Sequence, residues 1–74
     1  MEKPTVLIAD GNEEFRLALA GALAPHYRVL SCGSGWDALT LLRTHQPEIL
    51  VLDPTVPDLD GLSLLEIALQ ENLH

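Results

Sequence analysis

The chain has 74 residues, 47% of them apolar and 20% charged, which is the composition of one small globular domain or part of one and excludes a disordered chain. One cysteine excludes an intramolecular disulfide, and together with three scattered histidines it lacks the spacing of a structural zinc site. The formal net charge of −7 argues against direct binding to nucleic acid or to an anionic membrane, and favours metal cations and basic protein surfaces as partners.

The first strand and helix have clear signals. Residues 5–9 form a β-branched and apolar run that ends at Asp10, which predicts a buried strand. Asn12 is a suitable N-cap, and the two glutamates after it complement the helix dipole, so a helix is predicted over 12–24, before Pro25. Its apolar residues recur at helical spacing: Phe15, Leu19, Ala22 and Leu23.

Two more strand and helix pairs follow. A short strand with Arg28 in it is predicted over 27–31, and the arginine indicates an edge position. A helix begins after Ser34, which resembles a capping box with Asp37, and it ends before Pro47; its apolar face is Ala38, Leu39 and Leu42. The last pair is a strand over Ile49 to Leu52 and a helix over 61–73.

This alternation predicts an α/β fold with a parallel sheet and right-handed crossovers, in βαβαβα topology. The strand order 2-1-3 is favoured because strands 5–9 and 49–52 suit burial on both faces. Asp10 and Asp53, which follow these two strands, then meet at a topological switch point. No run approaches the ~20 apolar residues of a membrane span, and the N-terminal run is too short for a signal peptide, so the expected location is the cytoplasm.

Two interpretations fit Asp10 and Asp53. As acids before Gly11 and Pro54 they are ordinary turn formers, and as neighbouring carboxylates they suit a divalent cation such as Mg²⁺. The residues alone weigh the two equally, and the shared location favours the metal.

Other features have structural explanations. The sequence DLDG, from Asp58 to Gly61, is expected to form a turn and an N-cap rather than a calcium loop. Trp36 is expected to pack against the fold, and Cys32 to be a small, partly buried residue.

The sequence resembles the receiver domains of bacterial two-component response regulators. The resemblance is carried by VLIAD at 6–10, by Gly35, Ala38 and Leu39, and by ILVLD at 49–53 followed by Pro57, Asp60 and Gly61. It covers the chain from Thr5 onwards but only the first three of the family's five βα units, so residues 1–74 are expected to be an incomplete flavodoxin-like domain without strands 4 and 5.

The resemblance implies that Asp53 accepts a phosphoryl group from a histidine kinase or phosphotransfer protein. It also implies Asp10, Asp53 and the backbone carbonyl of Thr55 as ligands of Mg²⁺. Gly11 stands where the family has a second acid, so magnesium binding is expected to be weak or absent. The family's strand 4 hydroxyl and strand 5 lysine have no counterpart, and Lys3 is expected at the opposite end of the sheet.

The free side of the strand from Ile49 to Leu52 is predicted to be an open apolar edge through which the chain associates with itself. The expected function is the receiver module of a phosphorelay. The alternative is a degenerate module that takes no phosphate and acts in protein association. Because the required basic residue is absent, the 74 residues alone are not expected to be an enzyme.

Overall fold

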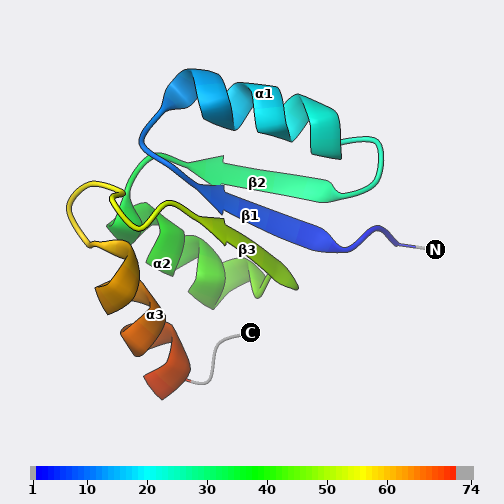
Figure 1. The fold of residues 1–74 in the computed structure, drawn as a ribbon. Helices are drawn as coiled ribbons and strands as arrows, with labels where there is room; N and C mark the ends of the chain where they lie inside the picture. The colour runs from blue at the N-terminus through cyan, green and yellow to red at the C-terminus, as the bar shows by residue number, and fades with distance from the viewer. Residues whose placement is uncertain (1, 72–74) are drawn as a thin grey trace.

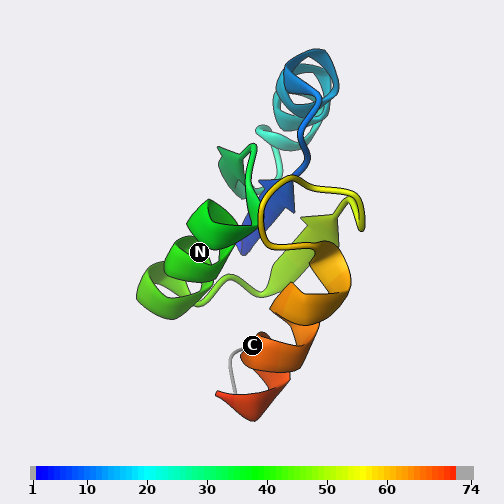
Figure 2. The same ribbon diagram turned by 90° about the vertical axis from the view of Figure 1, so that its left-hand side faces the viewer.

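A computed structural model describes residues 2–71 as three parallel strands and three helices in alternation. The elements in chain order are β1 Thr5–Ala9, α1 Glu13–Leu23, β2 Arg28–Cys32, α2 Gly35–His45, β3 Ile49–Leu52 and α3 Gly61–Gln70. The sheet order is β2-β1-β3, as the sequence predicted. Figures 1 and 2 show α1 on one face of the sheet and α2 with α3 on the other.

The core lies between the sheet and α2 with α3. The central strand β1 is buried from Val6 to Ala9 because it has a strand on each side and helices over both faces. The predicted apolar face of α2 is confirmed. Its three residues join Leu7, Ala9 and Leu64 in one cluster, and they are Ala38, Leu39 and Leu42.

The helix starts follow the local sequence. The side chains of Asn12, Ser34 and Asp60 each accept a hydrogen bond from the backbone N–H three residues later. These bonds satisfy donors that the first turn of a helix leaves without a partner. The predicted N-caps at Asn12 and Ser34 and the predicted N-cap in the DLDG sequence are therefore confirmed.

One element boundary needs correction, and another lies outside the described residues. β2 lies one residue later than predicted, because its ladder with β1 pairs Thr5 with Arg28 and Ala9 with Cys32. α3 ends at Gln70 with Glu71 as its C-cap, and the predicted end at Leu73 lies outside residues 2–71. α1 packs on β1 and β2, but none of its residues is fully buried, and Phe15 is 48% exposed.

Two surfaces are left uncovered. β3 pairs with β1 on one side only, and Ile49 at its start is 38% exposed. α3 turns three leucines outward, Leu62, Leu65 and Leu69. Among residues 2–71 no helix has the length and apolar character needed to cross a membrane.

Candidate functional site

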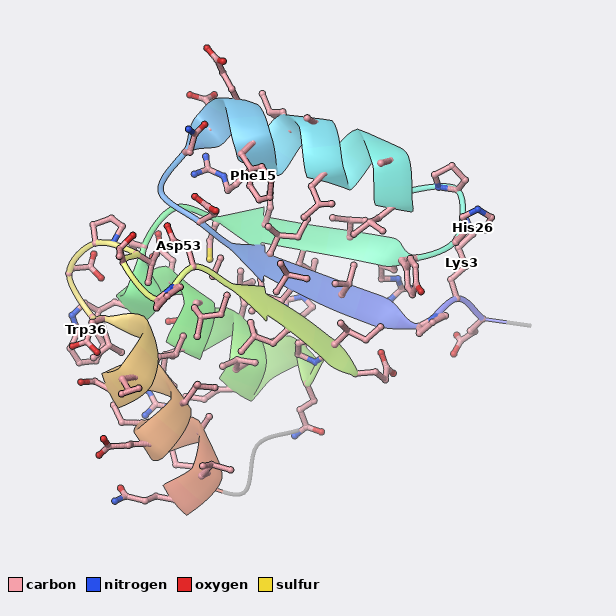
Figure 3. The ribbon with its side chains drawn as sticks, in the orientation of Figure 1. Lys3, Phe15, His26, Trp36 and Asp53 are labelled. Atoms are coloured by element: carbon pink, nitrogen blue, oxygen red, sulfur yellow. The ribbon has the colours of Figure 1, made fainter. Side chains whose placement is uncertain are left out.

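Asp10 and Asp53 lie side by side at the carboxyl end of the sheet. Ala9 and Leu52, the last residues of β1 and β3, are register partners, and the Asp53 N–H extends this ladder by donating to the Ala9 carbonyl at 2.9 Å. The structure thus brings together the two acids that the sequence singled out. Figure 3 shows Asp53 at this end of the sheet.

The Asp53 carboxylate is held by Thr55. Oδ1 of Asp53 accepts hydrogen bonds from the Thr55 N–H at 2.9 Å and from the Thr55 hydroxyl at 2.8 Å. These two bonds, the backbone one first, lower the pKa of Asp53 below its ordinary value, and the side chain of Asp10 contributes a smaller lowering. Asp53 is therefore ionised at neutral pH, which is the state a nucleophilic carboxylate needs.

Asp10 is fixed through three of its polar atoms. Its N–H donates to the Cys32 carbonyl at 3.1 Å, and its carbonyl accepts from Arg16 Nη1 at 2.7 Å. Its Oδ1 accepts from the Asn12 N–H at 2.8 Å. The side chain of Asp10 therefore forms a local turn while standing next to Asp53, so the two readings of this acid are compatible.

The carboxylate oxygens at this end are of the kind that Mg²⁺ binds. Two carboxylates from neighbouring strand ends are within the number that Mg²⁺ takes from proteins, since it keeps several waters. Gly11 offers no carboxylate, and no group of three or more His, Cys, Asp or Glu side chains among residues 2–71 could hold a metal ion. The Thr55 carbonyl belongs to the turn that begins at Asp53, where the Val56 N–H donates to the Asp53 carbonyl at 3.1 Å.

The loop between β3 and α3 is bound to the start of α2. The Gly35 N–H donates to the Pro57 carbonyl at 3.0 Å, and Oδ1 of Asp58 accepts from the N–H groups of Trp36 at 3.1 Å and Leu59 at 2.6 Å. These bonds, that of Leu59 first, lower the pKa of Asp58. We call this set of contacts the loop clasp; it fixes the segment that follows Asp53.

The loop clasp depends on unusual backbone positions. Asp58 has φ of 63°, which an aspartate tolerates better than most residues. At Gly35 an added Cβ would stand 1.7 Å from the Leu59 carbonyl oxygen, so no side chain fits there. The sequence prediction of a turn at Asp58 is confirmed, but its contact with α2 was missed because it joins residues 22 positions apart.

Trp36 corrects a sequence prediction. It was expected to pack, yet its side chain is 54% exposed at the first turn of α2 (Figure 3). Its backbone, rather than its ring, is what the loop clasp uses. Cys32 is partly buried as predicted, and burial raises the pKa of its thiol.

Lys3 and Arg16 lie at opposite ends of the sheet. Lys3 donates to the Ala24 carbonyl near the amino end of the sheet, far from Asp53, as predicted (Figure 3). Arg16 instead reaches the carboxyl end through its bond to Asp10. Sequence reasoning missed Arg16, since its position in α1 gives no signal of a contact with the strand before that helix.

Comparison with known proteins finds relatives in sequence and in fold. No family model matches the sequence. The transcriptional regulatory protein AfsQ1 of Streptomyces coelicolor is 36% identical over 62 residues, which are 82% of this chain and 28% of that protein. The receiver domain of the Francisella response regulator 1452 superposes with a TM-score of 0.88 at 30% identity, over 95% of this chain and 59% of that one.

The chain belongs to the response regulator receiver domains. Its three strands alternate with three helices, and the sheet has the order that the sequence predicted. The N-terminal domain of a response regulator receiver protein from Methanoculleus marisnigri agrees, with a TM-score of 0.79 at 26% identity over 86% of this chain and 53% of that one. The chain thus spans just over half of these receiver structures and 28% of AfsQ1.

Proposed function

We propose that this receiver module accepts a phosphoryl group on Asp53 from a histidine kinase or phosphotransfer protein. The observation that carries the proposal is the Asp53 carboxylate itself, which follows β3, is kept ionised by Thr55 and stands next to Asp10. A carboxylate at the carboxyl end of a parallel strand is where open α/β sheets place their chemistry.

The transfer is a substitution at phosphorus. A carboxylate oxygen of Asp53 attacks the phosphorus of a phosphohistidine, so that an O–P bond forms as the N–P bond breaks. The donor's imidazole leaves with the electron pair of that bond, and Asp53 becomes an acyl phosphate. The carboxylates of Asp10 and Asp53 with the Thr55 carbonyl would hold Mg²⁺, which neutralises charge on the transferring group when bound.

In this proposal residues 1–74 are an incomplete receiver domain. A hydroxyl and a lysine contact the phosphoryl group in the family that the chain resembles, and the lysine at hand, Lys3, lies at the wrong end of the sheet. Residues 1–74 alone then do not complete the transfer and are not an enzyme. The module works in the cytoplasm, and its net charge of −7 favours protein partners over direct contact with nucleic acid or membrane.

The test is phosphorylation followed by intact-protein mass. The 74-residue chain and the product of the full natural reading frame that contains it are each incubated with acetyl phosphate and Mg²⁺, with Asp53→Asn as control. We expect one phosphoryl adduct on the full product, none on its Asp53→Asn variant, and little on the short chain. An adduct on neither product, or an equal adduct on the Asp53→Asn variant, would overturn the assignment.

A second role is supported by the uncovered surfaces. We propose that the edge of β3, from Ile49 to Leu52, mediates self-association of the 74-residue chain. An exposed apolar edge strand offers unpaired N–H and carbonyl groups to another chain. The family membership does not favour the stronger alternative, in which association replaces phosphorylation altogether.

A further inference from the structure

The contacts of Asp10 single out Arg16. The chain has four Lys and Arg residues, and three of them lie away from the site. Lys3 bonds to Ala24, Arg28 begins β2 at the amino end of the sheet, and Arg43 bonds to Glu71 between α2 and α3 at 2.8 Å. Arg16 is therefore the one Lys or Arg among residues 2–71 that bonds at the carboxyl end of the sheet.

Arg16 joins α1 to the end of β1. Its Nη1 donates to the Asp10 carbonyl at 2.7 Å, in a partly buried position. Hydrogen bonds from a charged donor are short and stronger than neutral ones, so this bond restrains the turn between β1 and α1. The same turn presents the Asp10 side chain, whose Oδ1 is tied to the Asn12 N–H.

Gly33 leaves the space that the Arg16 guanidinium occupies. A Cβ added at Gly33 would lie 2.6 Å from Arg16 Nη1 and 3.4 Å from Cζ, so the guanidinium lies directly over the glycine. No described glycine has a positive φ, and the backbone at Gly33 would accept another residue. What the position requires is the absence of a side chain, and the group that uses this space is the Arg16 guanidinium.

We infer that Arg16, seated over Gly33, is a positioning residue that holds the turn after β1 so that Asp10 faces Asp53. The inference rests on the proposed phosphoacceptor role of Asp53 for its functional meaning. Because Gly11 supplies no second carboxylate, the site depends on the placement of this one neighbouring acid. Arg16 acts through the Asp10 backbone and does not touch the phosphoryl group.

The inference is tested with Arg16→Ala, Arg16→Lys and Gly33→Ala. The alanine at Gly33 displaces the guanidinium while keeping its charge, and the displaced atoms are the flexible end of a side chain, so the fold is kept. Gly21→Ala is the matched control because nothing lies within 4 Å of a Cβ there. Arg28→Ala controls for the loss of a positive charge at the far end of the sheet.

Two readouts separate this inference from the proposed function. The first is residue-level amide exchange at Asn12, whose N–H bonds to Asp10, and it needs no phosphorylation. The second is the rate of Asp53 phosphorylation by acetyl phosphate in the full natural product, resolved into the first-order rate constant at saturating donor and the donor concentration that gives half this rate. A small displacement of Asp10 from its place beside Asp53 slows the reaction step, so we expect the rate constant at saturating donor to fall about tenfold while the half-saturating donor concentration stays unchanged.

We expect Arg16→Ala and Gly33→Ala to accelerate Asn12 exchange and to lower the rate constant at saturating donor, while their unfolding midpoints stay near wild type. Arg16→Lys should show smaller changes than Arg16→Ala in both readouts. Asn12 exchange equal to wild type in both variants overturns the inference, as does an equal change in the Gly21→Ala and Arg28→Ala controls. If wild-type Asp53 takes no phosphoryl group, the proposed function fails while the exchange data still decide the role of Arg16.

Discussion

In each aspartate of the site one carboxylate oxygen forms the local hydrogen bonds. Oδ1 of Asp53 accepts both bonds from Thr55, and Oδ1 of Asp10 accepts the Asn12 N–H. These bonds shape the turns after β3 and β1, and they orient the carboxylates without using their second oxygens. A turn-forming aspartate is therefore a suitable starting point for a nucleophile or a metal ligand.

In the proposed magnesium site Gly11 supplies no carboxylate, and Gly11→Asp should strengthen Mg²⁺ binding. Its φ is not positive, and an added Cβ would meet Pro57 Cδ at 3.2 Å, so the loop has to move by a few tenths of an ångström. A third carboxylate raises the charge of the donor set, and we expect about tenfold tighter Mg²⁺ binding. Titration with Mg²⁺ monitored through Trp36, the single tryptophan, measures it.

Gly11→Asn is the control for that substitution, since it has nearly the same size and no charge. Equal Mg²⁺ affinity of the Asp and Asn variants would contradict the role given to the missing acid. A small cost in stability, about 1 kcal/mol, is expected in both variants because both crowd Pro57.

At the scale of elements, the loop clasp makes α2 and the segment after Asp53 one unit. The N-terminus of α2 receives its own cap, Ser34, and also the Asp58 carboxylate from the loop. Val56 and Leu59 of that loop are buried, so the clasp closes over apolar side chains. The loop that carries Thr55 is thereby fixed at both ends.

Gly35→Ala should break the loop clasp. The new Cβ would overlap the Leu59 carbonyl oxygen, and relief requires the loop to leave α2, which exposes Val56 and Leu59. We expect a loss of about 3 kcal/mol or more in the free energy of unfolding, measured by urea denaturation. Gly21→Ala in α1 should be neutral or stabilising, because alanine favours helix and the site is open. Similar losses in both variants would show that the clasp has no special role.

The sequence predicts what is local or periodic. The strands at residues 5–9 and 49–52, the N-cap at Asn12 and the buried face of α2 follow from apolar runs and capping chemistry. The site acids were found because each stands at the end of such a strand.

Contacts between distant residues could not be predicted in this way. Two contacts join segments that are distant in sequence and meet only in the fold. The Arg16 guanidinium lies over Gly33, and Asp58 accepts a hydrogen bond from the Trp36 N–H. The exposure of Trp36 was missed as well, since the sequence does not show what covers a side chain in the first turn of a helix. The helix was predicted to continue to Leu73, outside the described residues, because no Gly or Pro stop signal follows Gln70.

At the scale of the whole molecule, the chain is a thin slab of 31 × 28 × 14 Å with two different edges. β2 exposes Arg28 and Ser31 along its edge, and polar or charged residues there discourage pairing. β3 carries four apolar residues instead, with Ile49 exposed. The edge of β3 is also continuous in sequence with Asp53, so assembly and phosphorylation would act on one segment.

Ile49→Lys should therefore block self-association of the 74-residue chain. We expect the wild type to sediment as a dimer or larger species at micromolar concentration and the variant to shift to monomer, since a charged side chain on an edge strand opposes pairing. Leu17→Lys is the matched control, because it places the same charge on an exposed leucine of α1, away from β3. A wild-type chain that sediments as a compact monomer and unfolds cooperatively would rule out the edge as an association site. A variant with lysine at residue 17 that dissociates as fully as the one with lysine at residue 49 would show instead that net charge, not the edge, controls assembly.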